Sequence, residues 1–174
     1  MKHHLVPYAL IILICLSGAA AAAPQVSEVG TEVGRYAPPI ELPDLAGRKV
    51  SLEALHGSVI LLTFWSGSCP NCRAGLPSLN RLFASLGDKG LQVVCVVTDP
   101  TDNAMREYAA KNNITFNILL DPGKSALAET YRETALPVTY LIDRNGMIVE
   151  KFSGLEVWDA PEMKNLVVQL LEKK

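Results

Sequence analysis

The sequence predicts an α/β fold, a three-layer sandwich around a mixed central sheet. Residues 59–65 and 91–98 are apolar runs rich in β-branched residues, which is typical of strands buried on both faces. Each run is followed by a segment whose apolar residues recur at helical spacing. Two later strands, residues 135–143 and 147–153, are separated by a short turn and so form an antiparallel pair. Strand–helix units followed by a hairpin predict a mixed sheet.

The chain has 174 residues, of which 49% are hydrophobic. This is enough to bury one core, so we expect a single domain over residues 34–174. The formal net charge is −2, which argues against the basic surface that nucleic-acid binding requires. No nucleic-acid partner is therefore expected.

Residues 1–22 have the pattern of a signal peptide: Lys2 near the start, an apolar stretch over residues 5–16, and then small residues. The apolar stretch is almost long enough to span a bilayer, so an uncleaved anchor stays open. In both cases we expect the protein to be exported, either soluble or N-terminally anchored. Its compartment is then the periplasm or cell envelope, where disulfides are made and exchanged. Residues 23–33 show no periodicity and form a flexible lead-in.

The domain opens with a small hairpin made by residues 40–42 and 50–52 around a turn that contains Gly47. Residues 53–56 form one helical turn directly before the first long strand. A helix follows that strand and begins at Pro70, whose fixed φ suits the first helical position. The apolar residues of this helix lie on one face: Leu76, Leu79, Leu82, Phe83 and Leu86.

After a turn and the second long strand, Asp102 is a suitable N-cap for a helix that ends at Asn112. One face of that helix carries Met105, Tyr108 and Ala109. Residues 115–120 read as a short strand and residues 121–123 as a turn. A second short helix is expected over residues 124–131.

Pro137 lies near the start of the strand over residues 135–143, where a proline removes one ladder donor. It either simply opens the strand or forms a cis peptide bond with Leu136 that brings backbone beside the active cysteines. In the following turn, Asn145 and Gly146 suit a hairpin with both central residues at positive φ.

The chain ends in an amphipathic helix that Asp159 is expected to cap, with Pro161 in its first turn. Its predicted inward residues are Met163, Leu166, Val167, Leu170 and Leu171.

Two cysteines, Cys69 and Cys72, lie where the first long strand ends and its helix begins. The free N–H groups and positive dipole of a helix N-terminus favour thiolate over thiol. Such a setting lowers a cysteine pKa from about 8.5 to roughly 3.5–7.5. Cys72 lies one helical turn beyond Cys69 on the same side, so the two sulfurs can close a small disulfide. We expect Cys69 to attack substrates and Cys72 to resolve the product.

Two simpler roles for this pair are half of a zinc site and a structural disulfide. Zinc needs two more ligands, for which only Cys95 and His56 are available in the mature chain. A bridge across two residues closes almost no loop and stabilises little. Cys95 lies inside a predicted buried strand and His56 on a surface turn, so no metal site is expected.

Several motifs together are similar to a known family. They are Trp65 at the strand end, the Cys69-Pro70-Asn71-Cys72 motif, Pro77 in the following helix, residues 136–143, the Asn145-Gly146 turn and the lead-in at residues 34–39. With the export signal, they resemble the thioredoxin-like superfamily and, within it, the exported TlpA/ResA/DsbE group. The resemblance covers about residues 33–171.

The resemblance implies a thioredoxin-like sandwich with an N-terminal hairpin extension and a helix–strand insert at residues 99–122. It implies a cis bond before Pro137 opposite the disulfide. The residues that would support the cysteines are Trp65, Pro70, Asn71, Leu136 and Pro137. The activity implied is thiol–disulfide exchange with protein thiols and disulfides, in which the Cys69–Cys72 pair acts without a bound cofactor. A membrane-embedded electron donor would reduce the pair again, and cytochrome c maturation is a candidate role.

The sequence departs from this group at three positions. Ser68 stands where members usually carry tryptophan before the first cysteine. Gly75 stands where they often carry glutamate, and Thr63 where thioredoxin has a buried aspartate. The two missing carboxylates would help to take up the proton of Cys72, so we expect its resolving step to be slow at neutral pH.

Two other activities stay open. Ser66 lies three residues before Cys69, as in the Ser/Thr-x-x-Cys motif of peroxiredoxins, although Leu62 stands where those enzymes have proline. A thiol peroxidase is therefore one alternative. The other is a metallochaperone in which Cys69 and Cys72 bind Cu(I) through soft thiolates. Because residues 70–71 differ from those of the more reducing pairs, an oxidase role is also open.

Overall fold

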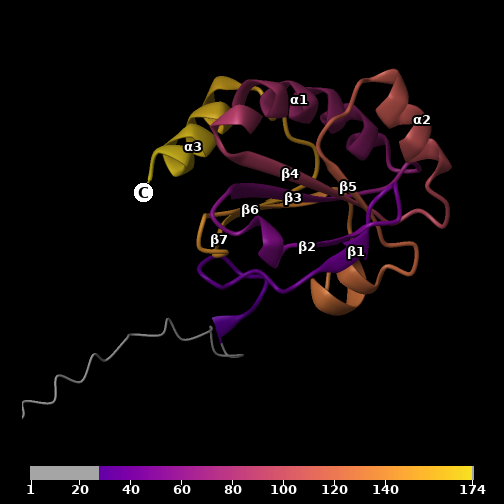
Figure 1. Cartoon of the computed structure of the whole chain (residues 1–174), viewed down its shortest axis with the longest axis horizontal. Coiled ribbons are helices and arrows are strands. Elements are labelled where there is room, and N and C mark those ends of the chain that lie inside the picture. Colours follow the sequence, from indigo (N-terminus) through magenta and orange to yellow (C-terminus); the bar gives the residue numbers. More distant parts are fainter. Residues whose placement is uncertain (1–27, 174) are drawn as a thin grey trace, which may run out of the picture.

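The computed structural model describes residues 28–173, so the expected signal peptide or anchor and residues 23–27 of the lead-in lie outside the described residues. Its centre is a five-stranded sheet with the order β5-β4-β3-β6-β7 (Figure 1). The strands are β3 (Val59–Trp65), β4 (Leu91–Val97), β5 (Asn117–Leu120), β6 (Val138–Ile142) and β7 (Ile148–Ser153). A separate hairpin is formed by β1 (Glu41–Pro43) and β2 (Lys49–Ser51). The predicted mixed α/β sheet is thus confirmed.

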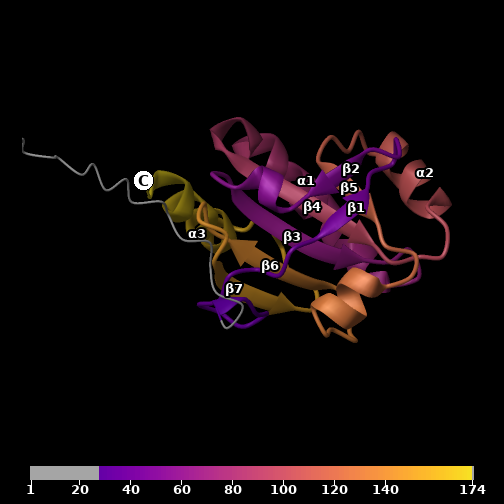
Figure 2. The same cartoon turned by 60° about the horizontal axis from the view of Figure 1, so that its bottom comes forward.

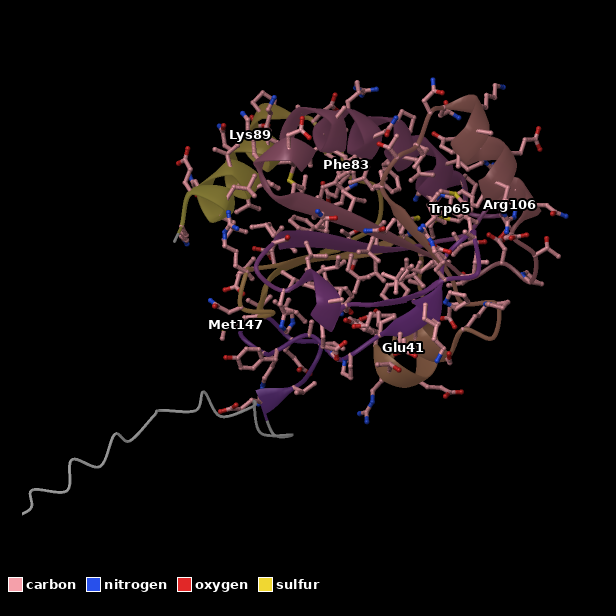
Figure 3. The ribbon with its side chains drawn as sticks, in the orientation of Figure 1. Glu41, Trp65, Phe83, Lys89, Arg106 and Met147 are labelled. Carbon is pink, nitrogen blue, oxygen red and sulfur yellow. A yellow bond between two sulfur atoms is a disulfide. The ribbon has the colours of Figure 1, made fainter. Side chains whose placement is uncertain are left out.

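Strand β3 is the centre of the sheet, and all seven of its residues are buried. It runs parallel to β4 and antiparallel to β6, while β5 extends the parallel side and β7 the antiparallel side. Because β3 and β4 are parallel and Trp65 is paired with Val97, the segments that follow these two residues start at the same edge of the sheet. Figure 3 shows Trp65 at this edge, near Arg106 and far from Lys89.

One face of the sheet is covered by three helices, α1 (Pro70–Leu86), α2 (Asn103–Lys111) and α3 (Pro161–Glu172) (Figure 1). Their apolar faces pack on inward residues of β3 and β4 in one hydrophobic cluster. The buried helix residues of the cluster include Leu76, Leu79, Leu82, Leu86, Met105, Val167 and Leu170. The predicted inward faces of all three helices are therefore confirmed.

The opposite face is covered by the β1–β2 hairpin, the 3₁₀ turn η2 (Glu53–Leu55) and the π-helical turn η4 (Ser125–Thr130) (Figure 2). A second hydrophobic cluster fills the space between these segments and the sheet. Within it, the ring centroids of Tyr131 and Tyr140 lie 5.0 Å apart. The Tyr131 hydroxyl donates to the carbonyl of Pro38 at 2.9 Å, which fixes the segment before β1 to this layer. The molecule therefore has the three predicted layers.

The short helix expected over residues 124–131 is the π-helical turn η4, and a buried carboxylate begins it. Asp121, 1% exposed, accepts the backbone N–H groups of Ser125, Ala126 and Leu127 at 2.9, 3.0 and 3.2 Å. These are orphan donors at the start of the turn. Asp121 is therefore a cap, a role that its place in an Asp-Pro-Gly sequence did not show.

Asp102 takes the predicted N-cap position of α2, but the capping side-chain bonds expected of Asp102 and Asp159 do not form. Helix α2 begins after Asp102 and helix α3 after Ala160, but neither helix receives a side-chain cap bond. The Asp102 carboxylate pairs with Arg106, and the Asp159 carboxylate pairs with Arg81 across the helix layer. Both aspartates are engaged by a guanidinium and not by the N–H groups of the helix that follows.

The hairpin between β6 and β7 forms, but not with both central residues at positive φ. Gly146 has φ +88°, whereas Asn145 is not in the positive region. The reason is Asp143, whose Oδ1 accepts the N–H groups of Asn145 and Met147, each at 2.9 Å. This side chain stabilises a different turn from the one that the Asn-Gly pair predicts.

The lengths of the helices also bear on membrane insertion. Within residues 28–173, no helix combines the length and the hydropathy that crossing a bilayer requires.

Candidate active site

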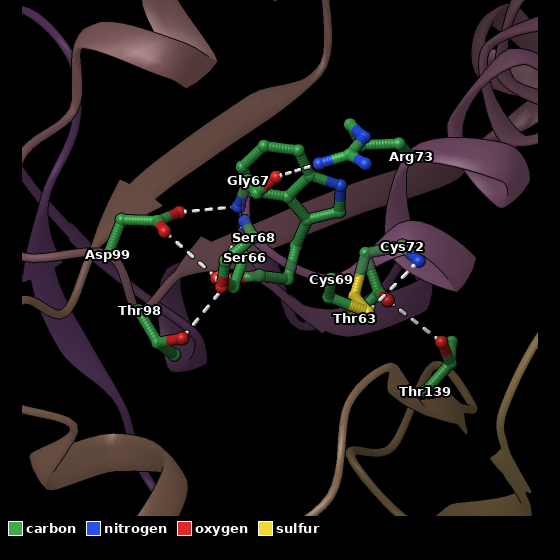
Figure 4. Close-up of a disulfide and its surroundings, with 11 residues drawn as sticks. Thr63, Ser66, Gly67, Ser68, Cys69, Cys72, Arg73, Thr98, Asp99 and Thr139 are labelled. Carbon is green, nitrogen blue, oxygen red and sulfur yellow. Dashed lines mark hydrogen bonds between the residues drawn. A yellow bond between two sulfur atoms is a disulfide. The ribbon is translucent and has the colours of Figure 1, made fainter.

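The two predicted cysteines lie at the first turn of α1 and form a disulfide (Figure 4). Cys69 is the N-cap of the helix and Pro70 its first residue, as the sequence predicts. The two Cα atoms are 5.2 Å apart, which is usual for bridged cysteines. The Cys72 N–H donates to the Cys69 sulfur at 3.1 Å. When the disulfide is open, this N–H and the helix dipole favour a thiolate at Cys69.

The two sulfurs differ in access. Cys72 is 2% exposed and belongs to the hydrophobic cluster under the helices, whereas Cys69 is partly exposed at its border. An incoming sulfur atom can therefore reach Cys69 directly, while Cys72 faces the protein interior.

The start of β6 lies beside the disulfide. The Leu136–Pro137 peptide bond is cis, as one of the two interpretations of the sequence predicts. Pro137 and Cys72 line the same small cavity, together with Thr63 of β3. Leu136 packs against both hydrophobic clusters, so the residues on either side of this bond are held near the site.

Two buried threonines lie next to Cys72 (Figure 4). Thr63 and Thr139 face each other across the β3–β6 pair and are 4% and 2% exposed. The Thr139 hydroxyl donates to the Thr63 hydroxyl at 2.8 Å. Thr63 stands where thioredoxin would carry aspartate, so here two hydroxyl groups occupy the position of a carboxylate.

The turn before Cys69 is held by Asp99, which follows β4 (Figure 4). Its carboxylate accepts the Ser66 hydroxyl at 2.8 Å and the Gly67 N–H at 2.7 Å. The Ser68 hydroxyl lies 2.8 Å from that of Ser66, and the Arg73 guanidinium donates to the Gly67 carbonyl. Sequence reasoning missed Asp99, although its place directly after a strand parallel to β3 was a signal that it would reach the same edge of the sheet.

The remaining predicted site residues also lie here. Trp65 is 2% exposed and lines the cavity that contains Cys72, as does the exposed Asn71. The indole N–H of Trp65 is buried and has no hydrogen-bond partner within residues 28–173. Pro70 is exposed beside the disulfide. The structure thus brings together all the site residues that the resemblance implied.

Cys95 and His56 lie elsewhere. Cys95 is a free cysteine, fully buried in β4, and burial raises the pKa of its thiol. His56 is exposed, and its ring packs against Gly146 at the other end of the sheet. In the described part of the chain, no three His, Cys, Asp or Glu side chains gather in a way that could hold a metal ion.

Comparisons with known proteins agree with this geometry. The AhpC/TSA family matches residues 33–151. The thiol-disulfide oxidoreductase ResA of Bacillus anthracis is 30% identical over 158 residues, which cover 88% of this chain and 91% of that protein. The thioredoxin-like protein YneN of Bacillus subtilis is 35% identical over 130 residues, 73% of this chain and 75% of that protein.

A similar fold is found among solved structures. A thiol:disulfide interchange protein from Bacteroides sp. aligns with a TM-score of 0.70 and 28% identity, covering 82% of this chain and 91% of that one. This similarity of fold, together with the Cys69–Cys72 disulfide at the start of α1, indicates the same kind of enzyme as the sequence relatives do. The chain therefore belongs to the AhpC/TSA family and is a thioredoxin-like thiol–disulfide oxidoreductase of the ResA and DsbE type.

Proposed function

We propose that Cys69 is the attacking cysteine and Cys72 the resolving cysteine in exchange with protein disulfides. The observation that carries this assignment is their difference in access: Cys69 is partly exposed at the helix N-cap, and Cys72 is 2% exposed. The hydrogen bond from the Cys72 N–H to the Cys69 sulfur supports this assignment, because the bond favours a thiolate at the accessible cysteine.

In this reaction the Cys69 thiolate attacks one sulfur of a substrate disulfide and expels the other sulfur as a thiolate. The Cys69–substrate bond is a mixed disulfide. The Cys72 thiolate then attacks the Cys69 sulfur, forms the Cys69–Cys72 disulfide and releases the second substrate sulfur. Two electrons pass from the enzyme to the substrate, and a dithiol donor must restore them before the next turnover.

The cellular setting is part of the proposal. Residues 1–22 direct export, as a signal peptide or an anchor, to the periplasm or cell envelope. A membrane-embedded donor reduces the Cys69–Cys72 pair, and Pro70 and Asn71 tune its potential. Pro137 and Leu136 form the surface against which the mixed disulfide lies, and the buried Trp65 supports the site from within. Cytochrome c maturation, in which a haem-binding pair of thiols must be kept reduced, is the process we propose to use such an enzyme.

The peroxidase alternative receives no support from the geometry. A peroxiredoxin-like role would use the Ser66 hydroxyl at the Cys69 sulfur, but this hydroxyl donates to Asp99. The copper alternative is separable by experiment: anaerobic titration of the reduced protein with Cu(I), beside a disulfide-exchange assay, distinguishes a carrier from an enzyme.

The assignment of the two cysteines is tested by trapping. Cys72→Ser is expected to accumulate mixed disulfides with protein substrates, because attack occurs and release does not. Cys69→Ser is the matched control and is expected to trap nothing, because the thiols of Cys72 and Cys95 are both buried. Non-reducing gels and mass spectrometry of the adducts give the measurement. Adducts formed through Cys72 in the Cys69→Ser variant would reverse the roles.

A further inference from the structure

A buried hydroxyl group near Cys72 has a hydrogen without an acceptor. Thr63 and Thr139 lie directly opposite each other in the antiparallel β3–β6 pair. The Thr139 hydroxyl donates to the Thr63 oxygen at 2.8 Å, so this bond does not use the hydrogen of the Thr63 hydroxyl. Thr63 is 4% exposed, and nothing within residues 28–173 accepts a hydrogen bond from its hydroxyl. Such an unused donor is rare in a protein interior and indicates a partner that the disulfide-bonded state does not supply.

Strand geometry places this hydroxyl on the same side of the sheet as Cys72. Side chains alternate between the two faces of a strand, and Leu61 and Trp65, two residues to either side of Thr63, belong to the hydrophobic cluster under the helices. Cys72 belongs to the same cluster. Thr63, Thr139 and Cys72 also line one small cavity of about 20 Å³. Figure 4 shows the Thr63 hydroxyl beside the sulfur atoms of the disulfide, with Thr139 on its other side.

A hydrogen-bond donor at this place would assist the resolving step. Cys72 must ionise before it attacks Cys69, and its apolar surroundings oppose a buried charge. The sulfur of a disulfide is a weak acceptor, whereas a thiolate accepts a strong, charge-assisted hydrogen bond. The Thr63 hydroxyl therefore gains a good acceptor only when the disulfide is open and Cys72 is a thiolate.

The polar and charged groups of the neighbouring segments are less suited to this role. Strands β3, β4 and β6 carry no charged residue. On α1, Asn71 is exposed, and the Arg73 guanidinium donates to the Gly67 carbonyl. Asp99 accepts the Gly67 N–H, and Glu156 follows β7 in the segment beside the cavity. An ionised carboxylate has no hydrogen to donate, so neither of these two acids can stabilise a thiolate.

We propose that the Thr63 hydroxyl donates a hydrogen bond to the Cys72 thiolate, and that Thr139 holds this hydroxyl in the orientation for the bond. Thr63 then contacts the reacting sulfur, whereas Thr139 is a positioning residue that acts through Thr63. The inference rests on the proposed role of Cys72 as the resolving cysteine. The threonine pair serves part of the function of the missing carboxylates: it does not accept the proton of Cys72, but it stabilises the thiolate that remains.

The step is balanced in protons and electrons. The Cys72 S–H bond breaks and its proton passes to solvent, while Thr63 keeps its own hydrogen. The Cys72 thiolate attacks the Cys69 sulfur, and the bond from Cys69 to the substrate sulfur breaks. The substrate leaves with the electron pair of that bond as a thiolate, which takes up a proton from solvent.

The direct test is the pKa of Cys72, measured by the ultraviolet absorbance of its thiolate during a pH titration of the Cys69→Ser protein. The thiol of Cys95 does not interfere, because burial raises its pKa. Adding Thr63→Val, which keeps the shape of the side chain and removes the hydroxyl, should raise the pKa of Cys72 by about one unit. Adding Thr63→Ser instead, which keeps the hydroxyl, should leave the pKa close to that of the parent protein. An unchanged pKa in the valine variant would overturn the inference.

A kinetic test in the active enzyme separates this role from packing. The measurement is single-turnover release of a mixed disulfide between Cys69 and a small thiol, across pH. Below the pKa of Cys72, Thr63→Val should release about threefold more slowly, because the loss of thiolate is partly offset by the greater nucleophilicity of a thiolate with a higher pKa. Above that pKa it should release faster than wild type, so the two profiles cross. A rate that is equally reduced at every pH would show a packing defect and contradict the inference.

Two further variants serve as controls. Thr98→Val removes a hydroxyl that is 1% exposed and donates to the Trp65 carbonyl away from the cavity, and it should leave the pKa of Cys72 unchanged. A rise equal to that of Thr63→Val would mean that any lost hydroxyl near the site has this effect. Thr139→Val should raise the pKa by less than Thr63→Val, because the donor stays and only its orientation is lost. A larger rise would make Thr139 the donor and overturn the assignment.

The outcomes distinguish this inference from the proposed function. If Cys72→Ser traps substrates but Thr63→Val leaves the pKa of Cys72 unchanged, the roles of the two cysteines stand and only this inference fails. The titration uses no substrate, so it decides whether Thr63 bonds to the Cys72 thiolate even if the trapping experiment reverses those roles.

Discussion

The described cysteines show how environment alone sets the chemistry of a residue. Cys69 lies at a helix N-cap and receives an N–H bond, Cys72 lies three residues on and is buried, and Cys95 is buried in the middle of β4. A thiolate is stabilised at the first of these positions and opposed by the apolar surroundings at the last. Residue type therefore says little about reactivity until the surroundings are known.

This contrast gives a prediction for Cys95. Because burial raises the pKa of its thiol, Cys95 should resist alkylation in the reduced, folded protein at pH 8, when Cys69 reacts. In denaturant it should react as fast as the other cysteines. Peptide mapping after iodoacetamide treatment measures the extent at each site. Rapid alkylation of Cys95 in the native protein would mean that β4 opens locally.

At the scale of elements, the active site depends on a tie between two segments that are far apart in the sequence. Asp99 follows β4, yet it holds the turn between β3 and α1 through Ser66 and Gly67. Both bonds involve a charged acceptor, and such bonds contribute more than neutral ones. The turn that places Cys69 is therefore stabilised from the neighbouring strand.

We expect Asp99→Ala to lower the free energy of unfolding by about 2 kcal/mol, because it removes two bonds to a carboxylate. Asp102→Ala is the control, since it removes only an ion pair with Arg106 near the surface and should cost less than about 1 kcal/mol. Urea unfolding of both variants gives the comparison. A loss for Asp99→Ala no larger than the loss for Asp102→Ala would contradict the stabilising role of Asp99.

At the scale of the whole molecule, two carboxylates tie together segments that are far apart in the sequence. Burial alone would raise the pKa of Glu133, but hydrogen bonds from Lys151 and Tyr140 outweigh it, so the pKa is lowered. The ion pair with Arg81 lowers the pKa of Asp159. When folding lowers the pKa of a carboxyl group, that group stabilises the folded protein at pH values above its pKa in the unfolded chain. The stabilisation is lost as the pH falls through its pKa in the folded protein.

The protein should therefore be less stable in acid. We expect the free energy of unfolding to begin to fall below about pH 4.3, the ordinary pKa of glutamate, and to keep falling to pH 3. Glu133→Gln should reduce the difference between pH 7 and pH 3, because glutamine does not titrate. Urea titrations at both pH values measure it. An unchanged difference in this variant would remove Glu133 from the groups responsible.

The features that the sequence predicted correctly depend on neighbouring residues. The buried strands follow from runs of apolar residues, and the inward faces of α1 and α3 from helical spacing. The position of Cys69 and Cys72 at a helix start follows from the strand before them and Pro70 after Cys69. A disulfide between residues three apart depends on local geometry alone, so the catalytic pair could be identified without a structure.

The errors and omissions concern polar side chains, whose partners are chosen in space. Asp102 and Asp159 bond to arginines and not to helix ends, and Asp143 determines the conformation of the turn at Asn145. Asp99 reaches the active site only because strand pairing places it there. A carboxylate can accept hydrogen bonds from many different donors at similar free energy. Its partner therefore depends on which donors the tertiary structure brings within reach. Hydrophobic pattern and local spacing thus determined the fold and the cysteine pair, and tertiary packing alone decided which groups surround Cys72.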